Sequence, residues 1–237
     1  MSACRHATTG LLVALLALPA SCTAAPAPSW ASELDRTGVT DRRVRAAMQK
    51  VRRADFLPPG MKAFEFEDFP LPIGHGQTTS QPTLIARMIQ DLKLKPGCRV
   101  LEVGTGSGYQ TALLAALCDE VVSLEIVAPL AAEASRRLTA LGYRNVTVKA
   151  GDGYLGWPQK APFDAIIVSA GAPRVPPPLV EQLKPGARLV IPVGYPDDEW
   201  ITVVTRQADG GTVTEQTLPV GFVPLTGPHG AEPKRRR

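Results

Sequence analysis

A short apolar segment that runs directly into alternating glycines constrains the fold of this chain more than any other feature. Residues 99–103 read RVLEV, as a buried parallel strand does, and an apolar, helix-forming run follows over 108–118. Between them stand Gly104, Gly106 and Gly108. Glycine adopts positive φ and lets the backbone approach a ligand closely, and the N–H groups of the following helix point at that ligand. The segment therefore predicts a strand–turn–helix unit that binds a nucleotide-like molecule.

The spacing of these glycines favours S-adenosyl-L-methionine over a dinucleotide. A dinucleotide fingerprint has its third glycine three residues after the second, whereas this chain reads GTGSG, preceded by the acid Glu102. We expect Glu102 to face the positively charged methionine end of the cofactor, directly or through water. A second acid, Glu125, ends the next strand-like run, where an acceptor can take both hydroxyls of a ribose.

A further turn, Gly151-Asp152-Gly153, follows the third predicted strand, at the edge where open α/β sheets bind ligands. Asp152 either accepts from the adenine amino group or belongs to an ordinary Asp-Gly turn. The small residues 169–173, SAGAP, end the fourth strand where an acceptor substrate would lie. The predicted cofactor-binding residues are Glu102, Gly104, Thr105, Gly106, Ser107, Gly108, Glu125, Asp152 and Gly153.

The order of elements predicts an α/β fold: a Rossmann-like, doubly wound sheet of the methyltransferase type, mostly parallel, with an antiparallel edge hairpin. A helix is expected over 41–51 and an irregular polar stretch over 64–82. Further helices are predicted at 83–92, 108–118, 128–141 and 177–183. Strands are predicted at 99–103, 121–125, 145–149, 163–171, 187–193, 200–207 and 213–222. The turn Asp209-Gly210-Gly211 joins the last two strands as a hairpin.

Residues 1–25 have the pattern of a secretory leader, with an apolar run over 11–20 that is too short to span a bilayer. Cys22 follows a segment similar to a bacterial lipoprotein cleavage site, although Pro19 replaces the usual aliphatic residue. The leader is therefore cleaved, lipidated at Cys22 with membrane attachment, or the product of a misassigned start. We expect a periplasmic or lipid-anchored protein if the leader is real, and a cytoplasmic one otherwise.

Two cysteines remain beyond the leader, at the entry of the first strand and the end of the returning helix. Cys98 and Cys118 could be neighbours, and an oxidising compartment would allow a disulfide, but two cysteines alone do not establish one. No metal site is predicted, since His75 and His229 stand far apart without ligand partners nearby. The formal charge of +4 and the solvated helix pattern of 41–55 predict no nucleic-acid site.

Several stretches resemble the protein-L-isoaspartate O-methyltransferase family, over roughly residues 35–227. They are LPIGHGQTTSQP (71–82), LEVGTGSGYQTALLA (101–115), GDGYLGW with PFDAIIVSAGAP (151–173), LKPGARLVIPVG (183–194) and VGFVPLTG (220–227). Generic methyltransferases share the second stretch but not the first or the last. The resemblance implies methyl transfer from S-adenosyl-L-methionine to the α-carboxylate of L-isoaspartyl residues in damaged proteins and peptides, which starts their repair to aspartate.

The same resemblance assigns roles to individual residues. It makes Ser80 the active-site serine and implies that backbone groups of two segments hold the isoaspartyl peptide in extended form. Thr79 stands where many members carry isoleucine or valine, and Gly171 where members often carry alanine. The implied substrate-binding residues are Thr79, Ser80, Gln81, Ala170, Gly171, Ala172, Val223, Pro224 and Leu225.

The length of 237 residues and the hydrophobic share of 44% predict one domain and not two. The methyltransferase domain is expected over 35–227, as a monomer. It divides into a helical prelude with the substrate loop, a cofactor-binding core, and C-terminal strands with a substrate segment: 35–95, 96–195 and 196–227. A tether over 26–34 precedes it and a basic tail over 228–237 follows it.

The proposed acceptor explains a site without an obvious catalytic histidine or cysteine. A carboxylate with a pKa of about 3.5 is ionised at neutral pH and needs no general base. The competing hypotheses are a methyltransferase for another acceptor, a non-catalytic module that binds modified peptides or a nucleoside, and a nicotinamide dehydrogenase. The substrate-loop signature disfavours the first. The three acids Glu102, Glu125 and Asp152 disfavour the second, and the alternating glycines disfavour the third.

Overall fold

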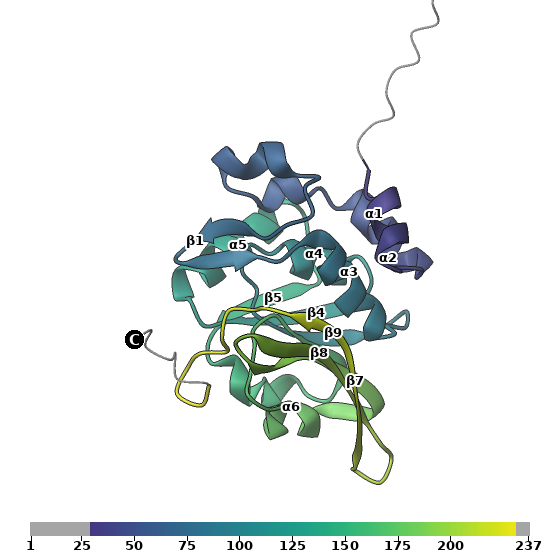
Figure 1. The fold of residues 1–237 in the computed structure, drawn as a ribbon. Helices are drawn as coiled ribbons and strands as arrows, with labels where there is room; N and C mark the ends of the chain where they lie inside the picture. The colour runs from purple at the N-terminus through teal and green to yellow at the C-terminus, as the bar shows by residue number, and fades with distance from the viewer. Residues whose placement is uncertain (1–28, 231–237) are drawn as a thin grey trace, which may run out of the picture.

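One seven-stranded sheet forms the centre of the computed structural model, which describes residues 29–230 (Figure 1). Its strand order is β5-β4-β3-β6-β7-β8-β9, with parallel pairing from β5 to β7 and antiparallel pairing from β7 to β9. The strands are β3 Arg99–Val103, β4 Glu120–Glu125, β5 Val146–Ala150, β6 Phe163–Val168, β7 Leu183–Tyr195, β8 Asp198–Arg206 and β9 Thr212–Val220. The predicted doubly wound sheet with an antiparallel edge is confirmed.

Six α-helices and four 3₁₀ turns connect the strands within the described residues. The helices are α1 Ala31–Arg36, α2 Arg42–Lys50, α3 Pro82–Asp91, α4 Tyr109–Ala115, α5 Ala128–Ala140 and α6 Pro177–Glu181. The 3₁₀ turns are η1 Arg53–Phe56, η2 Pro59–Phe64, η3 Gly153–Leu155 and η4 Pro158–Lys160. The helix α4 is shorter than predicted and ends at Ala115, where the Asn145 side chain donates hydrogen bonds to the carbonyls of Ala115 and Cys118.

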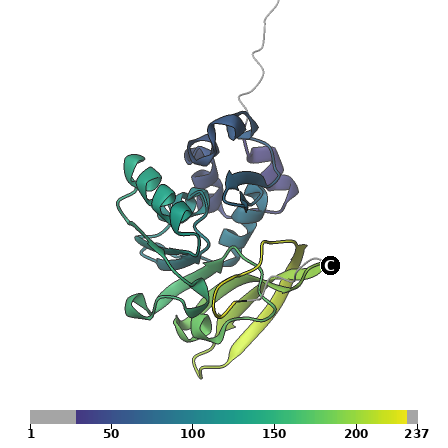
Figure 2. The ribbon, with the colours of Figure 1, turned by 90° about the vertical axis from the view of Figure 1, so that its left-hand side faces the viewer.

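The sheet carries a hydrophobic core on each face, as parallel strands that are covered on both sides require. Side chains of α1 to α5 pack on one face against Val100 of β3 and Val121 of β4. On the other face, Leu179 of α6 packs with Leu101 and Val103. Figures 1 and 2 show the purple and blue N-terminal elements at one end of the molecule and the yellow-green strands at the other.

The chain reverses its direction of progress across the sheet between β3 and β6. From β3 it moves outward through β4 to β5, then returns to β6 on the other side of β3 and continues to β7. In open α/β sheets, ligands bind at the carboxyl ends of the strands at such a switch point. The glycine-rich turn after β3 and residues 169–173 after β6 therefore meet where a ligand is expected.

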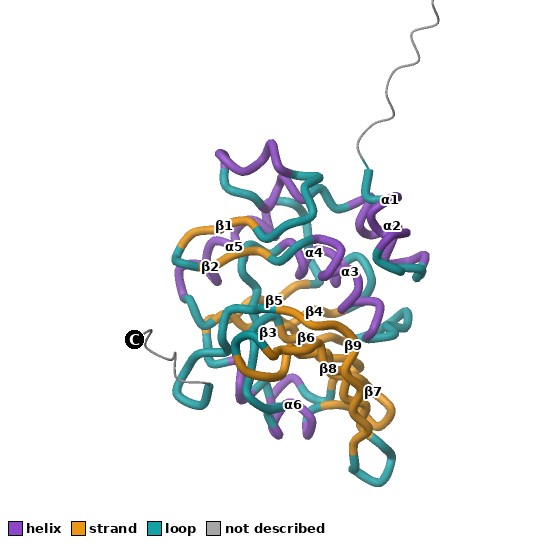
Figure 3. The backbone as a smooth tube through the Cα atoms, viewed as in Figure 1, coloured by secondary structure: helices purple, strands orange, loops and turns teal. Residues whose placement is uncertain are grey.

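The irregular stretch predicted over 64–82 contains a second, two-stranded sheet, which corrects that prediction. The strands β1 Leu71–Gly74 and β2 Gln77–Thr79 pair antiparallel, with a register irregularity after Pro72 (Figure 3). His75 lies in the turn between them, with φ of 52°. Its Nε2 lies 3.6 Å from a carboxylate oxygen of Glu133 on α5, so the hairpin reaches over that helix.

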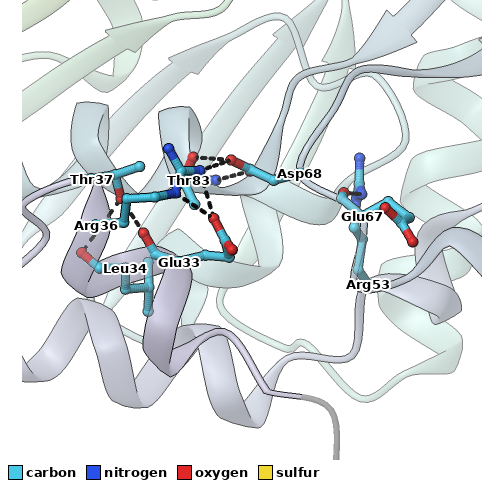
Figure 4. A network of polar contacts seen from close by, with 8 residues as sticks. All are labelled: Glu33, Leu34, Arg36, Thr37, Arg53, Glu67, Asp68 and Thr83. Atoms are coloured by element: carbon cyan, nitrogen blue, oxygen red, sulfur yellow. Dashed lines mark hydrogen bonds and ion pairs between the residues drawn. The ribbon is translucent and has the colours of Figure 1, made fainter.

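Side-chain contacts fix the segment that precedes this hairpin. The buried guanidinium of Arg53 donates to the carbonyls of Glu67 at 2.7 Å and Phe69 at 3.0 Å. Asp68 accepts from the backbone N–H of Thr83 at 3.0 Å and from its hydroxyl at 2.6 Å, and Arg36 lies 3.7 Å from the same carboxylate (Figure 4). Because Thr83 is in the first turn of α3, these bonds fix the start of the helix that follows Ser80.

Two predicted boundaries at the chain ends need correction. The helix α1 begins inside the predicted tether of 26–34, and Trp30 and Leu34 are buried in the main core. The described residues 29–34 therefore belong to the domain. The described part of the predicted basic tail, residues 228–230, also contributes to the fold, because His229 contacts Asp152. The predicted leader over 1–25 lies outside the described residues.

The cysteine pair that the sequence left open forms a disulfide. Cys98 and Cys118 are bonded, with Cα atoms 4.7 Å apart and both side chains buried. The bond joins the entry of β3 to the turn after α4. It therefore ties together the two ends of the strand–turn–helix unit that carries the glycine-rich turn.

Candidate active site

The glycine-rich turn after β3 has the backbone conformation that its sequence predicts. Gly104, Gly106 and Gly108 have φ of 95°, 53° and 90°. An added Cβ at Gly104 would lie 3.3 Å from Cβ of Ser169 and one at Gly106 would lie 3.2 Å from Cδ1 of Ile73. Side chains at these positions would therefore force both strain and displacement.

A cavity with about 810 Å³ of empty space opens at this turn. Residues from the glycine-rich turn, both strands of the hairpin, the ends of β4 and β6 and the C-terminal segment surround it. The predicted site residues among its lining are Thr79, Ser80, Gly104, Thr105, Gly106, Ser107, Glu125, Gly153, Ala170, Val223, Pro224 and Leu225. Gly108 does not line the cavity. It caps α4 and packs against Leu138.

Glu125 lies where the sequence predicts a cofactor-binding acid. Its carboxylate ends β4, lines the cavity and is 5% exposed. One oxygen accepts from the N–H of Gly106 at 2.8 Å and the other from the N–H of Val127 at 3.0 Å. These bonds fix the carboxylate beside the glycine-rich turn.

Glu102 differs from its prediction, because it does not line the cavity. It is fully buried beneath the glycine-rich turn, and its oxygens accept from Gln110 Nε2 at 3.0 Å, Thr111 Oγ1 at 2.5 Å and Ser123 Oγ at 2.6 Å. Burial raises the pKa of Glu102 to about 7, although these three hydrogen bonds favour the charged form. Direct contact with a bound cofactor is therefore corrected to a supporting position behind Gln110, which does line the cavity.

Asp152 is a turn residue that does not line the first cavity, and its contact with an adenine amino group stays a prediction. One oxygen accepts from the N–H of Tyr154 at 2.9 Å and caps η3, and the other lies 2.8 Å from Nδ1 of His229. The His229 ring stacks on Tyr154 with centroids 5.9 Å apart. The neighbouring Gly153 faces the cavity, and a Cβ there would collide with Val103.

A second cavity adjoins the first. It is lined by Thr78 of the hairpin and the residues that flank the hairpin, by the end of β9 and by the segment that follows β9. The predicted substrate residue Gln81 is among these flanking residues. Four residues line both cavities: Thr78, Ser80, Ser169 and Val223. Ser80 therefore lies at the junction of the two cavities, where a group could pass from a ligand in one to a ligand in the other.

The predicted substrate segments 170–172 and 223–225 are adjacent, but they bind each other. The N–H of Gly171 donates to the carbonyl of Val223 at 2.8 Å, and the N–H of Leu225 donates to the carbonyl of Gly171 at 2.7 Å. Ala172 is paired in turn with Pro192 and Gly194. The prediction that all these backbone groups hold a peptide is therefore corrected for Gly171 and Ala172. Their backbone groups are paired within the protein, and neither residue lines either cavity.

Sequence reasoning missed three side chains of this site. Gln110 lines the first cavity, and Thr78 and Ser169 line both. Glu199 of β8 also supports the site without lining either cavity. Its carboxylate accepts from the N–H of Phe222 at 2.7 Å and fills the space beside Gly171. Burial raises the pKa of Glu199. A strand-end position gave a usable signal for Ser169, whereas the others depend on tertiary contacts.

Neither a metal cluster nor a membrane-spanning helix occurs in the part of the chain that the structure describes. Over residues 29–230, no three histidine, cysteine or acidic side chains gather in a group that could hold a metal ion. In the same range, no helix has both the length and the apolar character needed to cross a membrane.

The fold and the first cavity together define a methyltransferase of the S-adenosyl-L-methionine-dependent class. A family model described as protein-L-isoaspartate(D-aspartate) O-methyltransferase (PCMT) matches residues 29–230. The chain belongs to this family. The match covers the hairpin and the C-terminal segment as well as the glycine-rich turn.

Curated relatives are similar over most of the chain. Protein-L-isoaspartate O-methyltransferase 1 of Nitrosospira multiformis is 54% identical over 187 residues, which cover 78% of this chain and 79% of that protein. Protein-L-isoaspartate O-methyltransferase of Anaeromyxobacter dehalogenans is 55% identical over 195 residues, which cover 81% of this chain and 93% of that protein.

Solved structures agree with these relatives. A protein-L-isoaspartate O-methyltransferase superposes with a TM-score of 0.74 at 30% identity, covering 83% of this chain and 64% of that chain, so this chain spans slightly less than two thirds of that protein. A putative protein-L-isoaspartate O-methyltransferase from Plasmodium falciparum, in complex with S-adenosyl-L-homocysteine, superposes with a TM-score of 0.70 at 28% identity. That match covers 82% of this chain and 95% of the other.

Proposed function

We infer that this chain transfers a methyl group from S-adenosyl-L-methionine to the α-carboxylate of L-isoaspartyl residues in proteins and peptides. The observation that carries this inference is the pair of adjoining cavities that share Ser80. One cavity contains the glycine-rich turn, and the other lies between the hairpin and the C-terminal segment, the two regions that distinguish this family. The ester that forms would cyclise to a succinimide and reopen partly to aspartate, which is repair.

The first cavity fits a nucleoside-containing cofactor. Its glycines leave the backbone free of side chains along one wall, where a ligand can approach closely. The turn from Gly104 to Ser107 and the carboxylate of Glu125 would hold the nucleoside, and Gln110 and Ser169 also line this cavity. When bound, S-adenosyl-L-methionine supplies an electrophilic methyl group on a positively charged sulfur.

The work of this chain is to align and dehydrate the acceptor carboxylate. That carboxylate is ionised at neutral pH, so no residue has to remove a proton. Holding two reactants in line contributes roughly 7–11 kcal/mol to such a reaction. The Ser80 hydroxyl, at the junction of the cavities, would donate a hydrogen bond that positions the carboxylate. Apolar walls from Ile73, Ile85 and Val223 would exclude water as the opposite charges neutralise each other.

The test is methyl transfer from labelled S-adenosyl-L-methionine by the full chain. One substrate peptide contains L-isoaspartate, and its matched control contains aspartate at the same position. The proposal predicts label in the isoaspartyl peptide alone, released as methanol on mild alkaline treatment because the product is an ester. Label in both peptides, or in neither while cofactor is bound, would overturn the proposed substrate.

We also propose that the protein works in an oxidising compartment outside the cytoplasm. The predicted leader over 1–25 and the buried Cys98–Cys118 disulfide support this location together, because disulfides persist mainly in such compartments. Lipid attachment at Cys22 is the corresponding proposal for the membrane. Cell fractionation with thiol trapping under denaturing conditions tests both.

In that experiment, the proposal predicts a shortened, oxidised chain in the periplasmic or membrane fraction. A Cys22→Ala variant separates the two forms, since it stays processed only if the leader is simply cleaved. A full-length, reduced chain in the cytoplasm would contradict export.

A further inference from the structure

Ser169 occupies the point where the two central strands of the sheet bring the cavities together. It directly follows β6, and its N–H donates to the carbonyl of Val103, at the end of β3, at 2.8 Å. Its side chain lies against the glycine-rich turn, because a Cβ at Gly104 would be 3.3 Å from Cβ of Ser169. With Ser80, it is one of the residues that line both cavities.

A buried amide fixes the orientation of the Ser169 hydroxyl. The Nε2 atom of Gln110 donates to Ser169 Oγ at 2.8 Å and to Glu102 Oε1 at 3.0 Å. Since an amide nitrogen carries two hydrogens, both are engaged. Glu102 is itself held by Thr111 and Ser123, so the amide has a fixed anchor on the side away from the cavity.

The hydroxyl of Ser169 therefore accepts a hydrogen bond from Gln110, and its own proton remains for donation to another acceptor. Within residues 29–230, the contact with Gln110 is the one hydrogen bond of this hydroxyl, and no protein acceptor takes its proton. No protein hydrogen bond of the Ser80 hydroxyl occurs in that range either. Three hydroxyl residues line both cavities: the exposed Thr78 of β2, Ser80 of the loop after β2 and Ser169 at the end of β6. Of these, Ser169 is the one whose hydroxyl is oriented by a protein hydrogen bond in the described residues.

We propose that Ser169 is a second catalytic hydroxyl, which donates to the acceptor carboxylate together with Ser80, and that Gln110 is its positioning residue. The inference rests on the proposed function, since it assigns a role at that same site. Two donors suit a carboxylate, which has two oxygens that each accept hydrogen bonds. They would fix the plane of the group as well as its position.

The reaction requires no proton from either serine. An oxygen of the carboxylate forms the new bond to the methyl carbon, and the electron pair of the breaking carbon–sulfur bond stays on sulfur. The carboxylate loses its negative charge and sulfur loses its positive charge, so nothing else has to be released. Both serines act as neutral donors throughout, and the pH dependence of transfer should not report their ionisation.

The first experiment compares Ser169→Ala, Ser80→Ala and the matched control Ser135→Ala, a serine of α5 outside both cavities. Two binding constants are measured besides turnover: that of S-adenosyl-L-homocysteine, and that of the isoaspartyl peptide with S-adenosyl-L-homocysteine present. We expect Ser169→Ala to weaken peptide binding roughly tenfold, as the loss of a hydrogen bond to a charged group does, and to change S-adenosyl-L-homocysteine binding less than twofold.

The outcomes separate this proposal from the proposed function. Peptide binding and turnover by Ser169→Ala within twofold of the Ser135→Ala control would overturn the role of Ser169 while the wild type still methylates. A loss confined to S-adenosyl-L-homocysteine binding would also overturn it, because the hydroxyl would then serve the cofactor. Failure of the wild type to methylate the isoaspartyl peptide would instead overturn the proposed function.

A double-mutant cycle tests the role of Gln110. Gln110→Met keeps the approximate shape of the side chain but removes its donors, so the Ser169 hydroxyl loses its orientation. In the otherwise wild-type chain, we expect Gln110→Met to weaken peptide binding several-fold. In the Ser169→Ala background, the same substitution should weaken peptide binding by less than a further twofold, because the effects of coupled residues are not additive. Equal effects in both backgrounds would show that Gln110 acts independently and would overturn its positioning role.

Discussion

The two cavities are built in different ways, although they share a wall. The cofactor side depends mainly on one local unit, the turn from β3 into α4, completed by Glu125 at the end of the neighbouring strand. The acceptor side is assembled from the hairpin and its flanking residues, the residue after β6, and the end of β9 with the segment that follows it, which are far apart in the chain. The first is determined by backbone conformation, and the second by a few side chains that tertiary packing brings together.

This difference predicts how substitutions act on the two cavities. Changes in the glycine-rich turn should affect cofactor binding through the backbone, whichever side chain is introduced. Changes on the acceptor side should leave the cofactor bound and act on the peptide. Four substitutions test the distinction.

The largest effect is expected for Gly104→Ala. With φ of 95° and a Cβ within 3.3 Å of Ser169, the turn must leave its binding conformation or carry strain of about 1–3 kcal/mol. We expect S-adenosyl-L-homocysteine binding to weaken roughly 10- to 100-fold by calorimetry. The control is Gly97→Ala, which has φ of 81° but open space around it. Equal losses in the two variants would show that general backbone strain, and not the site, is responsible.

Ser80→Ala should produce the next largest effect, on turnover. The hydroxyl is lost from the junction while the glycine-rich turn is untouched, so kcat should fall about tenfold or more with unchanged S-adenosyl-L-homocysteine binding. Steady-state kinetics with the isoaspartyl peptide measures the change. A fall in kcat of less than about threefold would remove Ser80 from the catalytic residues.

Gly171→Ala should have a smaller effect, confined to the acceptor side. A Cβ at this position would collide with a carboxylate oxygen of Glu199, which holds the N–H of Phe222 beside the second cavity. We expect the KM for the peptide to rise several-fold, and Glu199→Ala in the same chain to restore part of it by removing the collision. An unchanged KM in the Gly171→Ala variant would contradict this prediction, because it would show that Glu199 can move away from the new Cβ without disturbing the acceptor side.

Glu102→Gln should have the smallest functional effect and a distinct pH signature in stability. Because the folded-state pKa is about 7 and the ordinary value is 4.5, the folded protein retains a proton that the unfolded chain loses between these values. The contribution of Glu102 to stability is therefore complete below pH 4.5 and is lost as pH rises through 7, by about 3 kcal/mol in total. Thermal unfolding from pH 5 to 8 should show a melting temperature that falls less steeply in Glu102→Gln.

The control for this series is Glu181→Gln, which changes an exposed carboxylate at the end of α6. Its pH dependence should match the wild type. Parallel curves for Glu102→Gln and the wild type would contradict the raised pKa of Glu102.

The cofactor side could be predicted because its signals are local in the sequence. The alternating glycines and the acid at the end of the next strand lie within one βαβ segment, so periodicity and spacing were enough. The orientation of Glu102 was not predicted correctly. Side chains alternate along a strand, so Glu102 shares the face of Val100 under α4, while Leu101 and Val103 point to the opposite face.

The acceptor side could be predicted from the residues alone only in part. The hairpin escaped detection because its strands have four and three residues, one contains Pro72, and the pairing is irregular. The resemblance to the family identified Ser80, but no local pattern places Ser169 opposite it. Their proximity depends on the strand order, since β6 returns beside β3 only after the chain has completed β4 and β5.

The most direct test of this account is a crystal structure of the full chain with S-adenosyl-L-homocysteine and an isoaspartyl peptide. The account predicts S-adenosyl-L-homocysteine in the first cavity, against the glycine-rich turn and Glu125, and the peptide in the second. The α-carboxylate of the isoaspartyl residue should lie within hydrogen-bonding distance of both Ser80 and Ser169. A carboxylate bound away from both hydroxyls, or a peptide outside the second cavity, would contradict the assignment of the two cavities.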